Sequence, residues 1–569
     1  MKPILLGVAL LFATLAALQA ADTPQQTIRN LDRFKVLFNH DGTCVFASDS
    51  SYQSTKQPVS LKQVHGYVDE VADAQCSALL LSPYWGQTIP LWDSDVVPLW
   101  KGVGRTMNCP DTFQGKVIAR TRDLLLSGAD FVGETGKRCK ERKLPFLLSW
   151  RMFDVHGLEH PEDPWTNDFY KKNPQFRIGN PEVPFWNSRI ALDFSHPEVR
   201  AFQLSLVREL FERYDFEGIE LDFLRSPYFF SRRIPYEQRV ESLRAFFQGV
   251  REIVDRRGKD RPIGARVPQS WDLSLELGLD LAAFAREGLL DWVNVSPYYE
   301  TSSELEIARY REKLPGTRIF GELTQTTGVV KVVELGFEVS RKCTPEVLRS
   351  TAQTFLAQGA DGVSLFNFNY YRDYSFGASK HDDRTEPPYS ALYGIADRAR
   401  LATEPHHYVL SRKGWFKPGQ LPLRLDGASN RHLQTSLAIG QDYTRLENRA
   451  PYDETAVLRL LLEKPANGVD VLARLRGRIL KPCHVVGELF PLPYKDGVPQ
   501  DHARYLDYEV PLVLLEKGEN RFTLHVLQGK DVVLERLEVA IYRKGTGRSG
   551  MACGSTEAVS PLTVHSATP

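Results

Sequence analysis

Short apolar runs alternate with segments of helical periodicity along the first two-thirds of the chain. In the first such pair, Val64, Val68 and Val71 recur at helical spacing, and the run CSALLLSP that follows reads as a strand. The expected strands cover 33–40, 76–83, 144–150, 219–223, 261–268, 289–300, 317–325 and 359–373. The expected helices include 60–75, 117–142, 236–257, 280–286, 305–313 and 344–358, together with one that begins at His196-Pro197. Eight such alternations predict an α/β fold of the (β/α)₈ or TIM-barrel type rather than an open doubly wound sheet.

The pattern changes near Pro405. From 405 to 544 the chain consists of short alternating runs such as TAVLRLLLEK and VDVLARLRGRI, separated by Gly, Asn, Asp and Lys turns and without a long helix. This is typical of a C-terminal antiparallel β-sandwich domain. We therefore expect a barrel over 30–404, a sandwich over 405–544, and a small, polar, disordered tail over 545–569.

The fourth expected strand lies within YDFEGIELDFLRSP at 214–227, and the barrel is expected to be organised around it. Glu220 and Asp222 are two residues apart, so they share one face of the strand. The apolar residues between and beside them point to the other face. If that face packs on the surrounding helices, the two acids point into the barrel or toward its mouth. Burial of a carboxyl group is costly unless the group is hydrogen-bonded or used, and it shifts the pKa toward the working pH of an enzyme.

Composition and charge narrow the choice of partner. The chain has 569 residues, 42% of them hydrophobic, which is enough for a large catalytic domain and a smaller companion. Lys and Arg together number 71, as do Asp and Glu, so the formal net charge of zero favours neither nucleic acid nor an anionic membrane as partner. A neutral partner such as a carbohydrate fits better, and the oligomeric state stays open.

The first 20 residues, MKPILLGVALLFATLAALQA, combine a basic start, an apolar run and small residues before the expected cleavage after Ala20 or Ala21. This pattern predicts a secretory signal peptide and a secreted or periplasmic protein. No later stretch is long and apolar enough for a membrane span. The seven cysteines have wide, irregular spacing that matches no zinc signature, so we expect no metal and no other cofactor. Export permits disulfides, whose connectivity stays open.

Polar residues gather where the expected strands end, which is where a (β/α)₈ enzyme has its active site. They are Asn39, His40, Asp41, Ser82, Tyr84, Arg151, Asp154, Glu220, Asp222, Arg225, Arg266, Asn294, Tyr298, Glu300, Glu322, Gln325, Asn367 and Asn369, and the exit of the third strand also carries His156. Neither a metal-binding spacing nor a nucleophile elbow of the form GxSxG occurs among them. Carboxylates, amides, tyrosines and arginines are the groups of a sugar-binding site. We interpret the following as substrate-binding: Asn39, His40, Tyr84, Arg151, Asp154, Glu220, Arg225, Arg266, Asn294, Tyr298 and Asn367.

Hydrolysis of a glycoside needs two carboxyl groups on either side of the scissile bond. Asp222 is the first choice for one of them, as nucleophile or base, and Glu220 lies deeper and has a structural or pKa-tuning role. Glu322 is the leading candidate for the second, as acid, with pairing to Arg225 or Arg266 as its structural alternative. Glu300 and then Asp272 are its rivals.

The segment LDFSHPEVRAFQLSLVRELFERYDFEGIELDFLRSP resembles the bacterial glycoside hydrolases of the glycosyl-hydrolase-like family 10 group. In that group a "HPEVR" helix leads into a "DGIHLDD" strand, and the matching positions here are 196–200 and 218–222. The resemblance implies a (β/α)₈ barrel that acts on polysaccharides, with Asp222 as the acid of the fourth strand. Glu220 stands where the group often has His, and Phe223 where it often has a second acid. The strand also resembles the family 18 chitinase motif "DGIDIDWE", but its final Glu would fall on Leu224, which disfavours chitinase chemistry.

These observations predict a secreted glycoside hydrolase that cleaves a polysaccharide or oligosaccharide by paired-carboxylate acid/base catalysis. The alternative is a barrel that binds carbohydrate without turnover, in which the acids only accept hydrogen bonds from sugar hydroxyls. A third hypothesis is a barrel lyase or esterase, and the lack of a Ser/His pair weighs against the esterase.

Overall fold

A computed structural model describes residues 31–47, 59–179, 188–225, 227–332, 337–372, 386–412, 419–425, 432–491, 502–529 and 532–545. The expected signal peptide and all but the first residue of the expected tail lie outside the described residues. Within the described residues, no helix has the length and hydropathy that crossing a bilayer requires.

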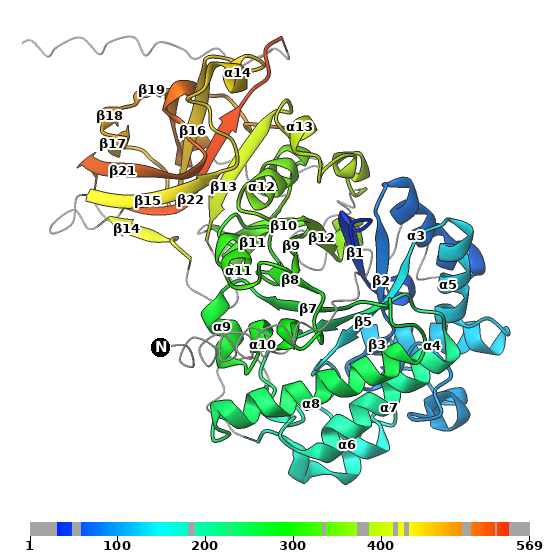
Figure 1. The fold of residues 1–569 in the computed structure, drawn as a ribbon. Coiled ribbons are helices and arrows are strands. Elements are labelled where there is room, and N and C mark those ends of the chain that lie inside the picture. Colours follow the sequence, from blue (N-terminus) through cyan, green and yellow to red (C-terminus); the bar gives the residue numbers. More distant parts are fainter. Residues whose placement is uncertain are drawn as a thin grey trace, which may run out of the picture.

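Eight parallel strands close into a barrel in the order β1-β12-β9-β8-β7-β6-β5-β2, which confirms the predicted fold (Figure 1). The strands are β1 (Val36–Asp41), β2 (Ala78–Ser82), β5 (Phe146–Arg151), β6 (Ile219–Asp222), β7 (Ile263–Pro268), β8 (Trp292–Ser296), β9 (Arg318–Leu323) and β12 (Gly362–Phe366). The longer helices around them are α3 (Leu61–Asp73), α4 (Phe113–Leu126), α5 (Phe131–Glu141), α7 (Pro197–Arg213), α8 (Tyr236–Asp255) and α12 (Pro345–Ala357). Shorter helices are α2 (Cys44–Ala47), α6 (Asp168–Lys172), α9 (Trp271–Glu276), α10 (Leu281–Arg286), α11 (Ile307–Lys313), α13 (Arg398–Leu401) and α14 (Leu446–Arg449).

The segment 117–142 forms two helices, α4 and α5, where the periodicity predicts one. Gly128 follows α4 with φ of 87°, a left-handed conformation that ends helices readily. The side chain of Asp130 then accepts hydrogen bonds from the backbone N–H groups of Val132 and Gly133, at 2.9 and 3.2 Å, and so caps α5. The break is therefore a local effect of a glycine and a capping aspartate.

The inside of the barrel changes character along its axis. Near the amino-terminal ends of the strands, the apolar side chains of Leu37, Leu147, Trp292 and Phe320 pack together. Two residues further along the same strands come Asn39, Ser149, Asn294 and Glu322, all buried. Because successive side chains alternate between faces, both layers point inward. The barrel is thus packed like an ordinary core at one end and filled with polar groups at the other.

Two antiparallel sheets follow the barrel, as predicted for the C-terminal part. One has the order β13-β22-β16-β20-β19 with β14 beside β22, and the other has the order β15-β21-β17-β18. Their bounds are β13 (His406–Ser411), β14 (Leu423–Leu425), β15 (His432–Ile439), β16 (Thr455–Leu462), β17 (Asp470–Leu475), β18 (Arg478–Ile479), β19 (Lys481–Cys483), β20 (Tyr505–Pro511), β21 (Gly518–Gln528) and β22 (Val532–Ile541). Apolar side chains from both sheets form a shared core.

Two small hairpins, which the sequence pattern does not predict, complete the fold. β3 (Tyr84–Trp85) pairs with β4 (Ile89–Pro90), and β10 (Thr326–Val332) pairs with β11 (Phe337–Lys342) between β9 and α12. Helix α12 packs against the barrel on one side and lies beside β13 on the other (Figure 1). The barrel and the sandwich therefore meet at α12 and at the second hairpin.

Candidate functional site

Asp222 at the end of β6 and Glu322 in β9 bind the same guanidinium group. Arg266 of β7 donates from Nη1 to both carboxylate oxygens of Asp222, at 3.1 Å each. Its Nε and Nη2 donate to the two oxygens of Glu322, at 2.6 and 2.7 Å. All three side chains are buried, so the two carboxylates compensate the charge of a guanidinium group that has no contact with solvent. We call these residues the acid–arginine triad.

Glu322 has further donors. Asn294 donates from Nδ2 to Oε2 at 3.0 Å, and the hydroxyl of Ser296 donates to Oε1. Burial raises the pKa of Glu322, and the charge of Arg266 acts in the opposite direction. Four donor groups on two oxygens suit a carboxylate better than a neutral acid, because a protonated oxygen would itself have to donate.

Glu220 lies one layer nearer the amino-terminal end of the barrel than Asp222. Asn39 donates from Nδ2 to its Oε1 at 2.8 Å, and the indole N–H of Trp292 donates to Oε2 at 3.4 Å. Burial and the nearby charge of Asp222 raise the pKa of Glu220 to about 8. The group is therefore a neutral acid at neutral pH.

A second set of buried charges lies at the carboxyl ends of β1, β5 and β6. Arg151 pairs with Asp41 at 2.7 Å and with Asp154 at 2.9 Å. The Nε of Arg225 lies 3.6 Å from Asp154, and its Nη1 donates to the hydroxyl of Tyr298 at 3.1 Å. We call Asp41, Arg151, Asp154 and Arg225 the mouth cluster. Burial alone would raise the pKa of Asp41, but Arg151 and Arg225 hold it well below its usual range.

Tyr298 connects the two sets of charges. Its hydroxyl accepts from Arg225 of the mouth cluster, while its backbone carbonyl accepts from Nη2 of Arg266 at 3.2 Å. The triad and the mouth cluster are therefore parts of one site.

Three non-glycine residues near the strand ends have left-handed backbone conformations. The φ angles are 87° at Tyr298, 49° at Asn367 and 54° at Gln87. The side-chain oxygen of Asn367 accepts from the backbone N–H of Asp41 at 3.0 Å, which fixes it beside the mouth cluster. Such conformations are costly for side chains with a Cβ and concentrate at functional sites.

Most of the residues predicted from the sequence as catalytic or binding come together here. The structure unites Asn39, Arg151, Asp154, Glu220, Asp222, Arg225, Arg266, Asn294, Tyr298, Glu322 and Asn367. Among the described residues, no group of three or more His, Cys, Asp and Glu side chains is arranged to hold a metal ion.

Four other candidates lie elsewhere: His40, Tyr84, Glu300 and Asp272. His40 is on the helix-facing side of β1 and stacks on Tyr67 of α3 with ring centroids 4.4 Å apart; its burial lowers the pKa to about 4. Tyr84 belongs to β3 of the first small hairpin, and its ring stacks on Trp150 of β5.

The two rival acids point away from the triad. The carboxylate of Glu300 lies toward β10, since a Cβ added to Gly328 would be 3.3 Å from its Oε2. Asp272 has a side chain that is 65% exposed and pairs with Arg309 at 2.7 Å.

Ser296 and His156 take part in the site but were not predicted as binding residues. Ser296 shares a strand face with Asn294, two residues away, and that spacing could have revealed it. The Nδ1 of His156 is within hydrogen-bond distance of Asp154, which precedes it by two residues at the exit of β5. For His156, the available signal in the sequence was the polar segment that follows the third expected strand.

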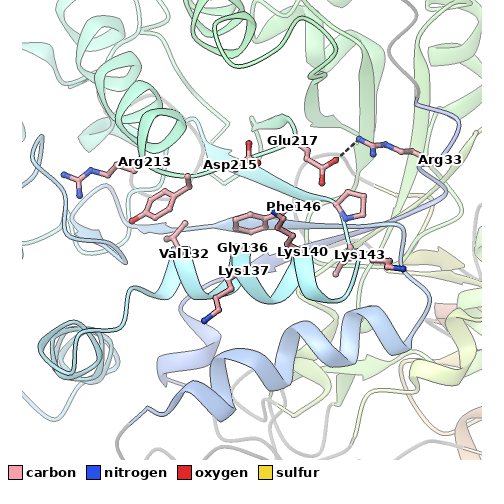
Figure 2. A pocket seen from close by; sticks show the side chains of 14 residues that line it. Arg33, Val132, Gly136, Lys137, Lys140, Lys143, Phe146, Arg213, Asp215 and Glu217 are labelled. Atoms are coloured by element: carbon pink, nitrogen blue, oxygen red, sulfur yellow. Dashed lines mark hydrogen bonds and ion pairs between the residues drawn. The ribbon is translucent and has the colours of Figure 1, made fainter.

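A cavity of 530 Å³ lies at the opposite end of the barrel, beside the amino-terminal ends of β5 and β6 (Figure 2). Phe146, Lys137 and Lys140 line it, and the ion pair between Arg33 and Glu217, at 3.0 Å, crosses its edge. Because this end of a (β/α)₈ barrel serves stability, we assign the chemistry to the carboxyl end.

The sequence matches no protein-family model and no curated protein. Among solved structures, the chain is similar to the PgaB (BpsB) glycoside hydrolase domain from Bordetella bronchiseptica, with 14% identity, 60% of this chain and 96% of that chain covered, and a TM-score of 0.38. It is also similar to alpha-L-fucosidase isoenzyme 2 from Paenibacillus thiaminolyticus, with 13% identity, 65% and 49% covered, and a TM-score of 0.38. A third similar structure is the maltogenic alpha-amylase AmyB from Thermotoga neapolitana, with 11% identity, 88% and 100% covered, and a TM-score of 0.36. These similarities are too distant to assign an activity to this chain.

Proposed function

We propose that this protein is a glycoside hydrolase that cleaves glycosidic bonds in a polysaccharide or oligosaccharide. The observation that carries this proposal is the site at the carboxyl ends of the strands, where buried carboxylates, guanidinium groups and amides surround the strained residues Tyr298 and Asn367. These groups can bind many hydroxyls at once, and carboxylates are the groups that glycoside hydrolysis uses. We also propose that the protein is exported, as the sequence of residues 1–20 predicts.

Asp222 is the carboxylate proposed to act as base or nucleophile. Besides the single Nη1 of Arg266, it accepts a hydrogen bond from the backbone N–H of Leu224 at 2.9 Å. It is held by fewer donors than Glu322 and lies at the very end of its strand, where catalytic groups of such barrels lie. We propose Glu322 as the positioning residue of Arg266, since its two oxygens are occupied by four donors.

A second candidate function is a barrel that binds carbohydrate without turnover. The observation that favours it is the triad itself, in which one arginine neutralises both of the acids first considered as a catalytic pair. In such a protein the arginine and amide groups would hold the sugar, and the carboxylates would only hold the arginine.

The test measures new reducing ends released from a broad panel of polysaccharides and oligosaccharides by the wild type, Asp222→Asn and Glu322→Gln. We expect Asp222→Asn to lose activity by about three orders of magnitude or more, because a catalytic carboxylate is removed, and activity is compared at conditions under which the variant is folded. Glu322→Gln is expected to lower activity less and to lower stability, because it leaves a buried guanidinium half compensated.

Matched surface variants control for the substitutions. Asp168→Asn and Glu312→Gln alter side chains that are 77% and 70% exposed, and both are expected to retain wild-type activity. If the wild type retains glycans from the panel but releases no reducing ends between pH 4 and pH 8, the binding barrel replaces the hydrolase. If Asp222→Asn stays fully active, a group other than Asp222 acts as base or nucleophile.

A further inference from the structure

A second cavity, with a volume of 560 Å³, lies outside the mouth of the barrel. The residues that line it come from the loop after β6, from the first turn of α8 and from the segment of α9, which follows β7. Segments that follow the strands of such a barrel gather at its carboxyl end, so this cavity is on the same side of the barrel as Asp222. We call it the outer cavity.

The outer cavity begins close to the mouth cluster. Arg225 belongs to that cluster, and its Nη1 donates to the hydroxyl of Tyr298 at 3.1 Å. Tyr228, three residues further along the chain, is part of the wall of the outer cavity. Three residues of extended chain span at most ~11 Å. A short run of linked sugar rings can therefore reach from the mouth into the outer cavity.

The walls of the outer cavity are held in place by backbone contacts. The side chain of Arg239 donates to the carbonyl of Ile234 at 2.8 Å and to that of Glu276 at 2.9 Å, and so joins α8, the loop before it and α9. The carbonyl of Phe229 in the same loop accepts from the backbone N–H of Phe194 at 2.8 Å. The cavity is thus preformed, and a ligand that enters it does not have to order the loop.

The lining combines an exposed aromatic ring with charged groups that the fold does not use. Tyr236, the first residue of α8, is 41% exposed. Within the part of the chain that the structure describes, neither the guanidinium of Arg232 nor the carboxylate of Glu276 forms a side-chain hydrogen bond or an ion pair. Burial raises the pKa of the Tyr228 phenol, and the charges of Arg232 and Glu276 act on it in opposite directions, so both lie near this ring.

Such a lining suits a sugar. The C–H face of a pyranose packs on an aromatic ring, and its hydroxyls can accept from a guanidinium group and donate to a carboxylate. An anionic ligand would gain from Arg232 but would be repelled by Glu276, so a neutral ligand fits better.

We propose that the outer cavity is a binding subsite for a sugar unit of the substrate that lies outside the pair of units whose bond is cleaved. Tyr236 supplies the ring on which this unit packs, and Arg232 and Glu276 bind its hydroxyls. The inference rests on the proposed function and narrows its substrate class. The substrate is a chain long enough to occupy the mouth and the outer cavity together, and not a glycoside of a single sugar.

The test measures kcat/KM on oligosaccharides of increasing length, prepared from the panel polysaccharide that the wild type cleaves fastest. We expect the wild-type value to rise with chain length. Tyr236→Ala is expected to lose about 3- to 10-fold on the longest substrates and less than about twofold on the shortest one cleaved, because only long chains reach the removed ring. Tyr236→Phe keeps the ring and should stay within about twofold of the wild type at every length.

Arg232→Gln is a second variant that leaves the backbone of the cavity intact, since Arg239 contacts only the carbonyl of residue 232. It should also weaken the longest substrates selectively. Ile479→Ala is the control for loss of an exposed apolar side chain, because Ile479 is 61% exposed and belongs to β18 of the sandwich. Its kinetics should match the wild type at every length. Circular dichroism checks that each variant is folded.

A wild-type kcat/KM that does not rise with chain length, or a loss in Tyr236→Ala that is equal at all lengths or absent, would overturn the subsite and leave the hydrolase standing. If the wild type cleaves nothing, the hydrolase fails, and the subsite is judged by the affinities of the wild type and Tyr236→Ala for the oligosaccharides of the panel. Weaker binding of the longest chains alone by Tyr236→Ala then supports the subsite. Affinities that do not differ in this way, or a wild type that binds none of them, overturn it.

Discussion

The carboxylates of Asp222 and Glu322 share the guanidinium of Arg266, and this sharing decides what each can do. Glu322 accepts hydrogen bonds from two guanidinium nitrogens and two further donors, so it is poorly placed to carry a proton. Asp222 accepts from only one side-chain nitrogen, so it has more freedom to accept a proton. The difference between the two acids therefore lies in their partners, although both stand on inward faces of barrel strands.

Glu220 gives a prediction at this scale. Its pKa is about 8 in the folded protein against 4.5 for an ordinary glutamate, so the folded state keeps a proton that the unfolded chain has released. Because the unfolded state then binds fewer protons, the free energy of unfolding should fall as pH rises from about 4.5 to about 8, by up to ~1.4 kcal/mol per pH unit. Glu220→Gln should lack this contribution and gain stability relative to wild type at pH 8. Urea denaturation at a series of pH values measures it.

The control for this prediction is Glu312→Gln, which changes an exposed glutamate and should keep the wild-type dependence on pH. A Glu220→Gln variant whose stability falls with pH as steeply as the wild type would show that Glu220 is ionised in the folded protein.

The sequence predicted which residues enter the site better than it predicted their partners. Alternation showed that Glu220 and Asp222 share a face, and the strand-end rule selected Arg266 and Glu322. Contacts between strands depend on the stagger of the closed barrel, which no local pattern contains. His40 is a different case, because it follows Asn39 directly and alternation alone places it on the opposite face, toward Tyr67.

At the scale of the elements, strands and helices whose burial is periodic were predicted, and elements set by turns or by long-range packing were not. The pattern predicted all eight barrel strands because each is covered by helices. It predicted one helix where Gly128 and Asp130 make two. The hairpin of β10 and β11 was missed, since it is held by contacts with the sandwich strands β13 and β22 and with the loop after β8, which are distant in sequence and leave no periodic pattern.

Gly264 in β7 allows a prediction about one strand. A Cβ at this position would lie 1.8 Å from a ring atom of Trp292 in β8, so the apolar layer of the barrel has no room for a methyl group. We expect Gly264→Ala to lower the free energy of unfolding by ~1–3 kcal/mol or more, because the ring must move or β7 must shift. The midpoint of chemical denaturation measures this.

Gly316→Ala is the matched control for Gly264. A Cβ at Gly316 would meet no atom within 4 Å, so this variant should be neutral or slightly stabilising. Equal midpoints for both variants would mean that Trp292 adjusts without cost.

For the whole molecule, the contact between barrel and sandwich is built from polar groups of both parts. The hydroxyl of Ser350 in α12 accepts from the backbone N–H of His407 at 2.7 Å, and Arg341 of β11 donates to the hydroxyl of Tyr505 at 2.8 Å. Arg536 of β22 donates to the hydroxyl of Thr327 at 2.7 Å. These groups are largely buried, so removal of one side leaves the other unsatisfied.

Truncation tests this contact. A chain that ends at residue 404 is expected to unfold at a much lower temperature than the full-length protein or to aggregate, because α12 and Arg341 lose their partners. A chain that ends at residue 545 keeps both sheets and should match the full-length protein. Thermal unfolding followed by circular dichroism compares the three, and a stable, cooperative 404-residue chain would show that the sandwich is dispensable for folding.

The pairing of charges within the site has a consequence for how a substrate arrives. Four carboxylates and three guanidinium groups are paired at 2.6 to 3.6 Å, so all but one of the negative charges of the site are neutralised locally, and the formal net charge of the whole chain is zero. Opposite charges so close together cancel at a distance, so little electric field reaches beyond the strand ends. Diffusion and shape, and not electrostatic steering, should therefore set the association rate, which makes encounter with a glycan insensitive to ionic strength.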